Sequence, residues 1–133
     1  MEVLASASGM LTGPDYQVRM ESGKHRFLAD EPEQLQGLDT GPDPYSLVLS
    51  GLVSCTAITL KMYAARKGWP LENAEVECRL IKAEAASAPE IIRTISLKGE
   101  LSEEQKQRLL QIASACPVHK MLSLGNAVHS SLA

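Results

Sequence analysis

Three cysteines are the residues of this chain best suited to covalent chemistry: Cys55, Cys78 and Cys116. Because the number is odd, any pairing within one chain leaves at least one thiol free. The first residues include the acidic Glu2 and no basic segment followed by a long apolar stretch, so they do not resemble a secretory signal. We therefore expect a cytoplasmic, reducing environment, in which cysteines serve chemistry or packing.

Cys116 lies in the segment ACPVHK at residues 115–120. Proline is favoured at the first position of a helix, so Pro117 predicts a helix with Cys116 as its N-cap. The unpaired backbone N–H groups and the positive end of the helix dipole then face the sulfur, and both favour the thiolate. His119 and Lys120 add positive charge in the same turn. This local pattern favours Cys116 as the more acidic thiol; the alternative is a small buried residue at a helix junction.

Cys116 and His119 also have a Cys-x-x-His spacing that could form half of a metal site. A structural zinc site needs about four ligands. The remaining cysteines and histidines offer no second pair at ligand spacing, so the sequence argues against a metal. These residues are Cys55, Cys78, His25 and His129.

Cys55 lies in a stretch from Tyr45 to Leu60 that contains no charged residue. The stretch includes serine, threonine and glycine, and it is shorter than the roughly 20 apolar residues of a membrane span. It predicts a helix buried on nearly all sides, which follows an N-cap at Asp43 and ends at residues 68–70, Gly-Trp-Pro. One chain of this size does not supply all the partners of so enclosed a helix, so we expect a homodimer.

On position alone Cys55 is a core residue, since free cysteine is among the most buried residue types. Small residues surround it along the helix. They either leave a narrow apolar channel to the sulfur, suited to a substrate with a hydrocarbon tail, or allow another helix to approach closely. These are Ser50, Gly51, Ser54 and Ala57. Cys78 alternates with Val76 and Leu80 on a predicted strand and is interpreted as a packing residue.

The other elements follow from hydrophobic periodicity and from breakers such as proline and glycine. Strands are expected at residues 16–21 and 25–29, and an irregular segment over 30–44. A hairpin follows within residues 72–100, its second strand marked by Ile91, Thr94, Ile95 and Leu97. A capping box at residues 102–105 opens a helix that ends near Cys116. A short helix from Pro117 to Leu124 and a final strand over residues 126–132 complete an α+β fold, a single domain over residues 1–133.

Composition limits the classes of function. The 133 residues carry thirteen basic and sixteen acidic side chains, for a net charge of −3, with no block of like charges. Nucleic-acid binding needs a positive surface, and one Phe, one Trp and three Tyr are too few for base-stacking platforms. We therefore expect no nucleic-acid partner and no membrane span.

Two motifs taken together resemble the OsmC/Ohr family. Residues 41–57, GPDPYSLVLSGLVSCTA, are similar to the family's central-helix signature, and residues 116–120, CPVHK, are similar to its second cysteine motif. Residues 29–32, ADEP, and 66–70, RKGWP, resemble the OsmC-like branch in particular. The resemblance covers most of the chain, and two cysteine motifs at this spacing are more specific than either one alone.

The resemblance implies an intertwined homodimer in which a long buried central helix is wrapped by antiparallel sheets. It also implies a thiol-dependent peroxidase for organic hydroperoxides. Cys55 attacks the peroxide, Cys116 resolves the sulfenic acid as a disulfide, and an external dithiol restores both thiols. In the family that reductant can be a lipoylated protein, and neither a metal nor an organic prosthetic group is needed. A low pKa of Cys116 is compatible with these roles, because it makes Cys116 a good leaving thiol during reduction.

One residue that the resemblance leads us to expect is missing. The family's peroxidases use an arginine near the N-terminus and a glutamate early in the central helix that orients it. Ser46 stands where that glutamate is expected, and a serine cannot form the ion pair. Arg19 is the best candidate for the arginine and Arg26 the second, although both also fit a solvated strand face.

The leading hypothesis is therefore a hydroperoxide reductase with a Cys55/Cys116 redox pair and Arg19 as the polarising residue. Because of Ser46, the alternative is a non-catalytic OsmC-like protein, either a redox sensor or a binder of a small apolar ligand. A third hypothesis is a structural protein with inert buried thiols.

Overall fold

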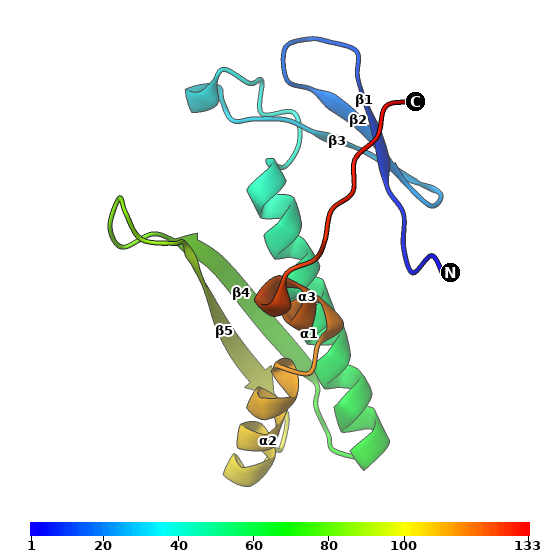
Figure 1. The fold of residues 1–133 in the computed structure, drawn as a ribbon. Coiled ribbons are helices and arrows are strands. Elements are labelled where there is room, and N and C mark those ends of the chain that lie inside the picture. The colour runs from blue at the N-terminus through cyan, green and yellow to red at the C-terminus, as the bar shows by residue number, and fades with distance from the viewer. The chain divides into compact units, whose positions relative to one another are not determined.

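The structure, a computed structural model, describes residues 1–133 and divides into two compact units, Met1–Val48 and Leu49–Ala133. Three strands and a short 3-10 helix are followed by one long helix, a two-stranded hairpin and two shorter helices (Figure 1). Strands and helices are thus segregated along the chain, which confirms the α+β prediction. The single domain over the whole chain stays a prediction.

The first unit is built on a three-stranded antiparallel sheet in the order β1-β2-β3. The strands span Ser8–Leu11 (β1), Val18–Ser22 (β2) and His25–Ala29 (β3). Ser22 pairs with His25, so two residues close the hairpin, and Gly23 supplies the φ of 59° that so tight a turn needs. The sequence predicts β2 and β3. It misses β1, whose four residues show no alternation of apolar and polar side chains.

Asp30 holds the segment that follows β3. Its carboxylate accepts hydrogen bonds from the backbone N–H of Glu31 (2.8 Å) and from the N–H and hydroxyl of Thr40 (3.2 and 2.6 Å). The irregular structure predicted for residues 30–44 is confirmed, except for one 3-10 turn at Glu33–Leu35 (η1). A buried carboxylate that accepts from the backbone thus fixes a segment without strand pairing.

The long helix α1 spans Pro44–Lys67, and both of its predicted ends are confirmed. Asp43 caps the N-terminus, because its carboxylate accepts the backbone N–H of Ser46 at 3.2 Å. Gly68, with a φ of 70°, follows the last helical residue. The buried residues of α1 recur every fourth position and form one stripe. They are Leu52, Thr56, Leu60 and Ala64.

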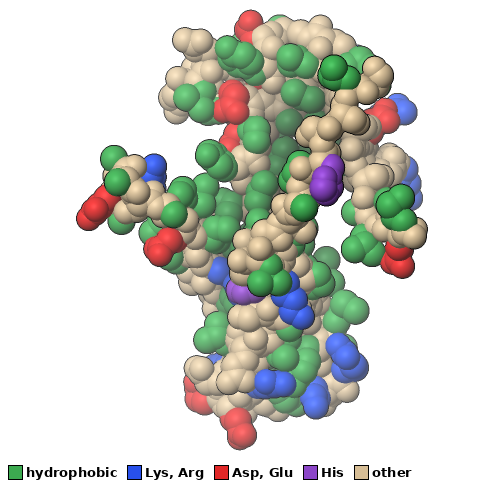
Figure 2. Space-filling view, viewed as in Figure 1, with side chains coloured by type: hydrophobic (Ala, Val, Ile, Leu, Met, Phe, Trp, Pro, Cys, Tyr) green, Lys and Arg blue, Asp and Glu red, His purple; other side chains and the backbone are tan.

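A single chain buries only this stripe of α1, so the burial on nearly all sides that the sequence predicts is not reached within one chain. Val48, Ile58 and Met62 are 48%, 58% and 60% exposed. By length and composition alone, α1 is also long and apolar enough to cross a membrane, a property that core helices of soluble proteins share. Hydrophobic side chains are visible on the hairpin too (Figure 2).

The hairpin of the second unit pairs β4 (Asn73–Ile81) with β5 (Glu90–Lys98), and burial alternates strictly along both strands. The face of β4 that carries Cys78 is the predicted one. On β5, Thr94 is exposed, and Arg93 shares the more buried face. This inward face consists of Ala74, Val76, Cys78, Leu80, Ile91, Arg93, Ile95 and Leu97.

Two short helices complete the second unit. α2, Glu103–Ala113, opens with the predicted capping box, in which the Ser102 hydroxyl accepts the Gln105 N–H at 3.1 Å and the Gln105 side chain accepts the Ser102 N–H at 3.0 Å. α3, Pro117–Leu124, has Cys116 as its N-cap, as predicted. The predicted strand over residues 126–132 is wrong, because no strand of the chain pairs with this segment.

The core of the second unit forms where α1, the hairpin and α2 meet. Leu60 and Leu109 are fully buried and pack with Ala64, Leu71 and Ala113. Side chains from the inward face of the hairpin cover this cluster, among them Ile95 and Leu97. Because the same helix α1 carries Cys55, this packing also fixes the position of the thiol.

Replacing Leu109 tests this core. Leu109→Ala should lower the free energy of unfolding by about 2–5 kcal/mol, because it leaves a cavity among fully buried side chains. The matched control is Leu110→Ala on the same helix, where the side chain is 54% exposed and the loss should stay within about 0.5 kcal/mol. Urea denaturation measures both variants, and equal midpoints would show that α2 does not pack through Leu109.

Candidate active site

The structure brings together the two cysteines that the sequence selects. Cys55 lies in the middle of α1 and is partly exposed, whereas Cys116, at the N-terminus of α3, is fully buried. Both are free thiols, and their side chains are hydrogen-bonded to each other. A pair of thiols in contact suits a two-cysteine redox cycle, because a disulfide can form between them without a large movement of the chain.

Three hydrogen bonds reach the Cys55 sulfur. Besides the thiol of Cys116, the donors are the backbone N–H of Val118 in the first turn of α3 and the side chain of Thr59. Thr59 stands four residues after Cys55, so the two side chains lie on the same face of α1. The N–H of Val118 is one of the donors that a helix N-terminus leaves unpaired. All three hydrogen bonds favour the thiolate form of Cys55.

These contacts set the order of the two acidities. Burial alone would raise the pKa of Cys55, but the three hydrogen bonds and the positive charge of Arg93 outweigh it, so the pKa is lowered. The pKa of Cys116 is raised, mainly by burial and next by the hydrogen bond to Cys55. The N–H of His119 donates to the Cys116 sulfur (N–Sγ 3.5 Å) and lowers the pKa, but by less. Cys55 is therefore the more acidic thiol of the pair, and Cys116 donates to its sulfur.

The prediction that Cys116 is the more acidic thiol is wrong. The predicted helix N-terminus is present, and the His119 N–H faces Cys116 as expected. However, Cys116 is buried, and the Val118 N–H of the same turn also serves the sulfur of Cys55. The N-terminus of α3 thus stabilises negative charge on the Cys55 sulfur as well as on its own N-cap residue, Cys116.

Arg93 belongs to the same cluster and is not among the residues predicted from the sequence. Its Nη1 donates to the Thr56 hydroxyl and its Nη2 lies against Nδ1 of His119, each at 3.1 Å. A guanidinium only donates, so Nδ1 of His119 accepts and the ring is neutral. Arg93 is also the cross-strand partner of Cys78. The alternation of β5 was the available signal, because it places Arg93 in register with Ile91 and Ile95 on an apolar face.

A cavity of about 360 Å³ lies beside this cluster. Leu52 of α1, Ile91 of β5 and Leu122 of α3 supply apolar walls, and Arg93 and His119 supply polar groups. Glu90 and Ser123 add further polar groups, so the lining is mixed, and neither cysteine is part of it. Clefts that combine apolar walls with a few convergent polar groups commonly bind small molecules.

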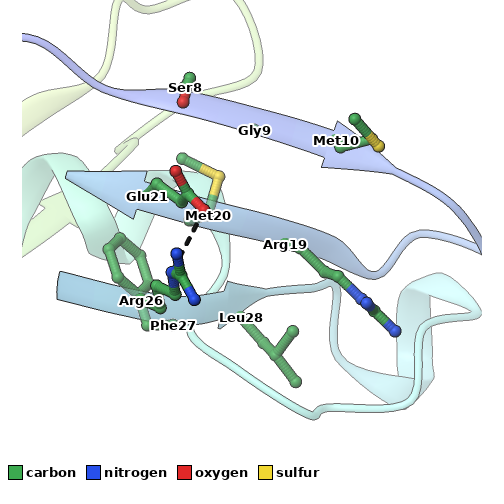
Figure 3. A pocket seen from close by; sticks show the side chains of 9 residues that line it. All are labelled: Ser8, Gly9, Met10, Arg19, Met20, Glu21, Arg26, Phe27 and Leu28. Atoms are coloured by element: carbon green, nitrogen blue, oxygen red, sulfur yellow. Dashed lines mark ion pairs between the residues drawn. The ribbon is translucent and has the colours of Figure 1, made fainter. Parts of the chain in front are cut away.

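Arg19 lies in the first unit, in β2, at a cavity of about 630 Å³ on the three-stranded sheet. Its cross-strand neighbours are Met10 and Leu28, and it points away from the ion pair of Arg26 with Glu21 (Nε–Oε1 3.2 Å; Figure 3). Arg26, the second candidate, is thus already paired. The polarising role of Arg19 stays a prediction.

Ser46 contributes to the cap of α1. Its hydroxyl donates to the carboxylate of Asp43, which also accepts the Ser46 backbone N–H. The hydrogen bond from the Ser46 side chain is the main reason that the pKa of Asp43 is lowered. The first turn of α1 contains no acidic residue. The structure therefore contains no helix carboxylate in place of the missing glutamate.

Comparison with known proteins decides the family. The family model described as OsmC-like protein matches residues 37–131, most of the chain. This chain belongs to the OsmC-like family. Among solved structures, an OsmC-like protein from Mycoplasma pneumoniae aligns with a TM-score of 0.77 at 19% identity, over 92% of this chain and 89% of that one.

Two further structures of this fold are named for hydroperoxide resistance. The protein from Legionella pneumophila aligns with a TM-score of 0.66 at 18% identity, over 91% of both chains. That from Elizabethkingia anophelis gives a TM-score of 0.67 at 17% identity, over 90% of this chain and 88% of its own. Identities this low show a shared fold. No curated protein matches the sequence.

The contact between the thiols can be tested by alkylation in this OsmC-like protein. Because its pKa is lowered, Cys55 should reach half-maximal alkylation by iodoacetamide at a lower pH than Cys116 or Cys78. Cys116→Ala removes a donor and should move the Cys55 midpoint to higher pH, whereas Cys116→Ser keeps an O–H donor and should move it less. Mass spectrometry of the labelled peptides resolves the three sites. If Cys116→Ala does not change the Cys55 midpoint, Cys116 is not the donor that lowers the pKa of Cys55.

Proposed function

We propose that this chain reduces organic hydroperoxides through a Cys55/Cys116 redox pair. The observation that carries the proposal is the hydrogen bond from Cys116 to Cys55, in which the attacking thiolate has its resolving thiol as a neighbour. The proteins from Legionella pneumophila and Elizabethkingia anophelis are named as organic hydroperoxide resistance proteins, which supports the proposal at the level of the family.

The proposed reaction uses two steps within the chain. The Cys55 thiolate attacks the terminal oxygen of R–O–O–H, so that an S–O bond forms and the O–O bond breaks. The leaving alkoxide takes up a proton and departs as the alcohol, and Cys55 becomes a sulfenic acid. The Cys116 sulfur then attacks the sulfenic sulfur, and hydroxide leaves and combines with the thiol proton as water. An external dithiol reduces the resulting disulfide by exchange.

The cavity beside the site supports an organic substrate. Its volume of about 360 Å³ leaves room for a group larger than hydrogen peroxide, and Leu52, Ile91 and Leu122 offer apolar contacts to a hydrocarbon part of it. We propose that a dithiol is the reductant, and a lipoylated protein is one such reductant that the resemblance implies. The proposed location is the cytoplasm, where such reductants keep thiols reduced.

We also propose that the working unit is a homodimer. Within one chain the apolar side chains of Val48, Ile58 and Met62 on α1 remain about half exposed or more. Monomeric proteins rarely leave contiguous apolar surface of this kind uncovered. A second copy of the chain would cover this side of α1.

Ser46 supports a second candidate function, a non-catalytic redox sensor or a binder of a small apolar ligand. The first turn of α1 has no carboxylate, so nothing there can orient an arginine from the N-terminal unit. Such a protein would be oxidised once by peroxide and would not cycle with a dithiol. A protein with inert thiols would resist alkylation until it unfolds.

Turnover separates these possibilities. With an alkyl hydroperoxide and a dithiol, Cys55→Ser should abolish turnover, because no nucleophile remains. Cys116→Ser should allow one round of sulfenic acid formation at Cys55 and then stop or slow strongly, whereas Cys78→Ser should turn over like the parent protein. Peroxide consumption and trapping of the sulfenic acid by dimedone measure both steps. Unchanged turnover in Cys55→Ser, with no Cys55–Cys116 disulfide, would refute the proposal.

The missing carboxylate generates a separate expectation. If its absence limits the rate, Ser46→Glu should raise peroxide turnover by about tenfold or more, since positioning of a reacting group contributes several kcal/mol in well-oriented systems. Ser46→Gln, of equal size and neutral, is the matched control. Adding Arg19→Met to Ser46→Glu should remove the gain if Arg19 is the partner. Equal rates for Ser46→Glu and Ser46→Gln would exclude a limiting role of the carboxylate.

A further inference from the structure

Arg93 is the one charged side chain on the inward face of the hairpin, whose other members are apolar residues and Cys78. Burying a charge among apolar groups is costly unless hydrogen bonds compensate it. Arginines that meet this cost usually pair with a carboxylate. Arg93 does not: the ion pairs of the chain involve Arg26, Arg79 and Lys106.

Two neutral groups hold the guanidinium instead. The Thr56 hydroxyl donates to the carbonyl of Leu52 at 2.6 Å, one turn earlier in α1, so a lone pair of its oxygen is free to accept Nη1 of Arg93. On the other side, Nδ1 of His119 accepts Nη2. The planar guanidinium is thereby fixed between α1 and α3, the two helices that carry the reactive thiols, and its charge stays uncompensated.

We infer that Arg93 is the fixed positive charge of the Cys55–Cys116 site, and that Thr56 and His119 are positioning residues that hold it there. The inference deepens the proposed function and rests on it for its catalytic consequence. The family resemblance implies an arginine oriented by a glutamate. A carboxylate partner would cancel part of that charge, whereas a hydroxyl and a neutral imidazole orient the guanidinium without cancelling it.

The ionisable groups around the site are consistent with this role. Arg93 faces Cys78 on β4, and its charge acts on the thiols of both Cys55 and Cys78. From α3 it meets His119, and Cys116 lies at the start of the same helix. Glu90 lines the cavity beside Arg93 without forming an ion pair with it. No acid therefore pairs directly with Arg93, although the charge of Glu77 also acts on the thiol of Cys78.

The first test measures ionisation of Cys55 apart from peroxide chemistry. Site-resolved alkylation across a pH series should show that Arg93→Met moves the Cys55 midpoint to higher pH, with about threefold to tenfold less alkylation near neutral pH, because one pKa unit is a tenfold change in thiolate. Arg79→Met is the matched control. It lies on β4, is exposed, pairs with Glu77 (3.6 Å) and stands on the opposite face, so the Cys55 midpoint should not move.

Variants at the two holding residues test positioning. Thr56→Val and His119→Leu each remove one acceptor and should shift the Cys55 midpoint in the same direction as Arg93→Met, by less. Thr56→Ser and His119→Asn keep an acceptor at nearly the same place and should restore most of the parent midpoint. If Thr56 and His119 had a purely structural role, the variants that remove the acceptor and those that keep it would have the same Cys55 midpoint. Only their melting temperatures would differ. These variants also carry the test if Arg93→Met does not fold.

The outcomes separate this inference from the proposed function. The role of Arg93 would be overturned if Arg93→Met folds and keeps the Cys55 midpoint of the parent protein. It would also be overturned if Arg19→Met, and not Arg93→Met, shifts that midpoint. A shift in Arg93→Met that Thr56→Val and His119→Leu both fail to reproduce would overturn the positioning roles. If the midpoints shift as expected but the parent protein turns over no peroxide, the proposed function fails and the electrostatic assignment stands.

Discussion

The hydrogen bond between the Cys116 thiol and the Cys55 sulfur is the interaction on which the site depends. A thiol donates only weakly, so this contact matters mainly through the asymmetry that it creates. It favours the thiolate at one sulfur and the thiol at the other, and it holds the two atoms in contact before any oxidant arrives. The core around Leu60 and Leu109 fixes α1, and a turn at residues 114–115 leads into α3. The rest of the second unit serves to keep these two helix positions together.

The same site shows how a fold can replace an ion pair by neutral contacts. A carboxylate beside an arginine fixes its direction but reduces its field at the neighbouring sulfur, in proportion to how close the carboxylate is. Thr56 and His119 fix the direction of the Arg93 guanidinium without reducing its positive field. The cost is the burial of an uncompensated cation on an apolar sheet face, a cost of several kcal/mol for an isolated charge that the two hydrogen bonds and partial exposure reduce.

Much of the fold was predictable because it rests on local signals. The breakers around α1, the capping box of α2 and Pro117 at the start of α3 each fix an element end within a few residues. The pairing of Cys55 with Cys116 came from a resemblance between motifs. Their relative acidity could not be predicted, because it depends on burial of Cys116 and on a donor, Val118, that acts across to another helix. The role of Arg93 could not be predicted without the register of the hairpin, which places it opposite Cys78. The strand predicted over residues 126–132 is wrong because no strand pairs with this segment, which the sequence alone does not reveal.

Contact between the two sulfurs also bears on the fate of the protein under excess oxidant. A sulfenic acid that waits for a distant resolving thiol is exposed to a second peroxide, which converts it irreversibly to a sulfinic acid. In the proposed cycle the resolving thiol, Cys116, is already hydrogen-bonded to the sulfur that peroxide would oxidise, so no segment would have to unfold or travel before the disulfide forms. The competition between resolution and overoxidation therefore favours resolution. A site arranged in this way suits a scavenger that must survive bursts of oxidant, and it is poorly suited to a peroxide signal that depends on inactivating the enzyme.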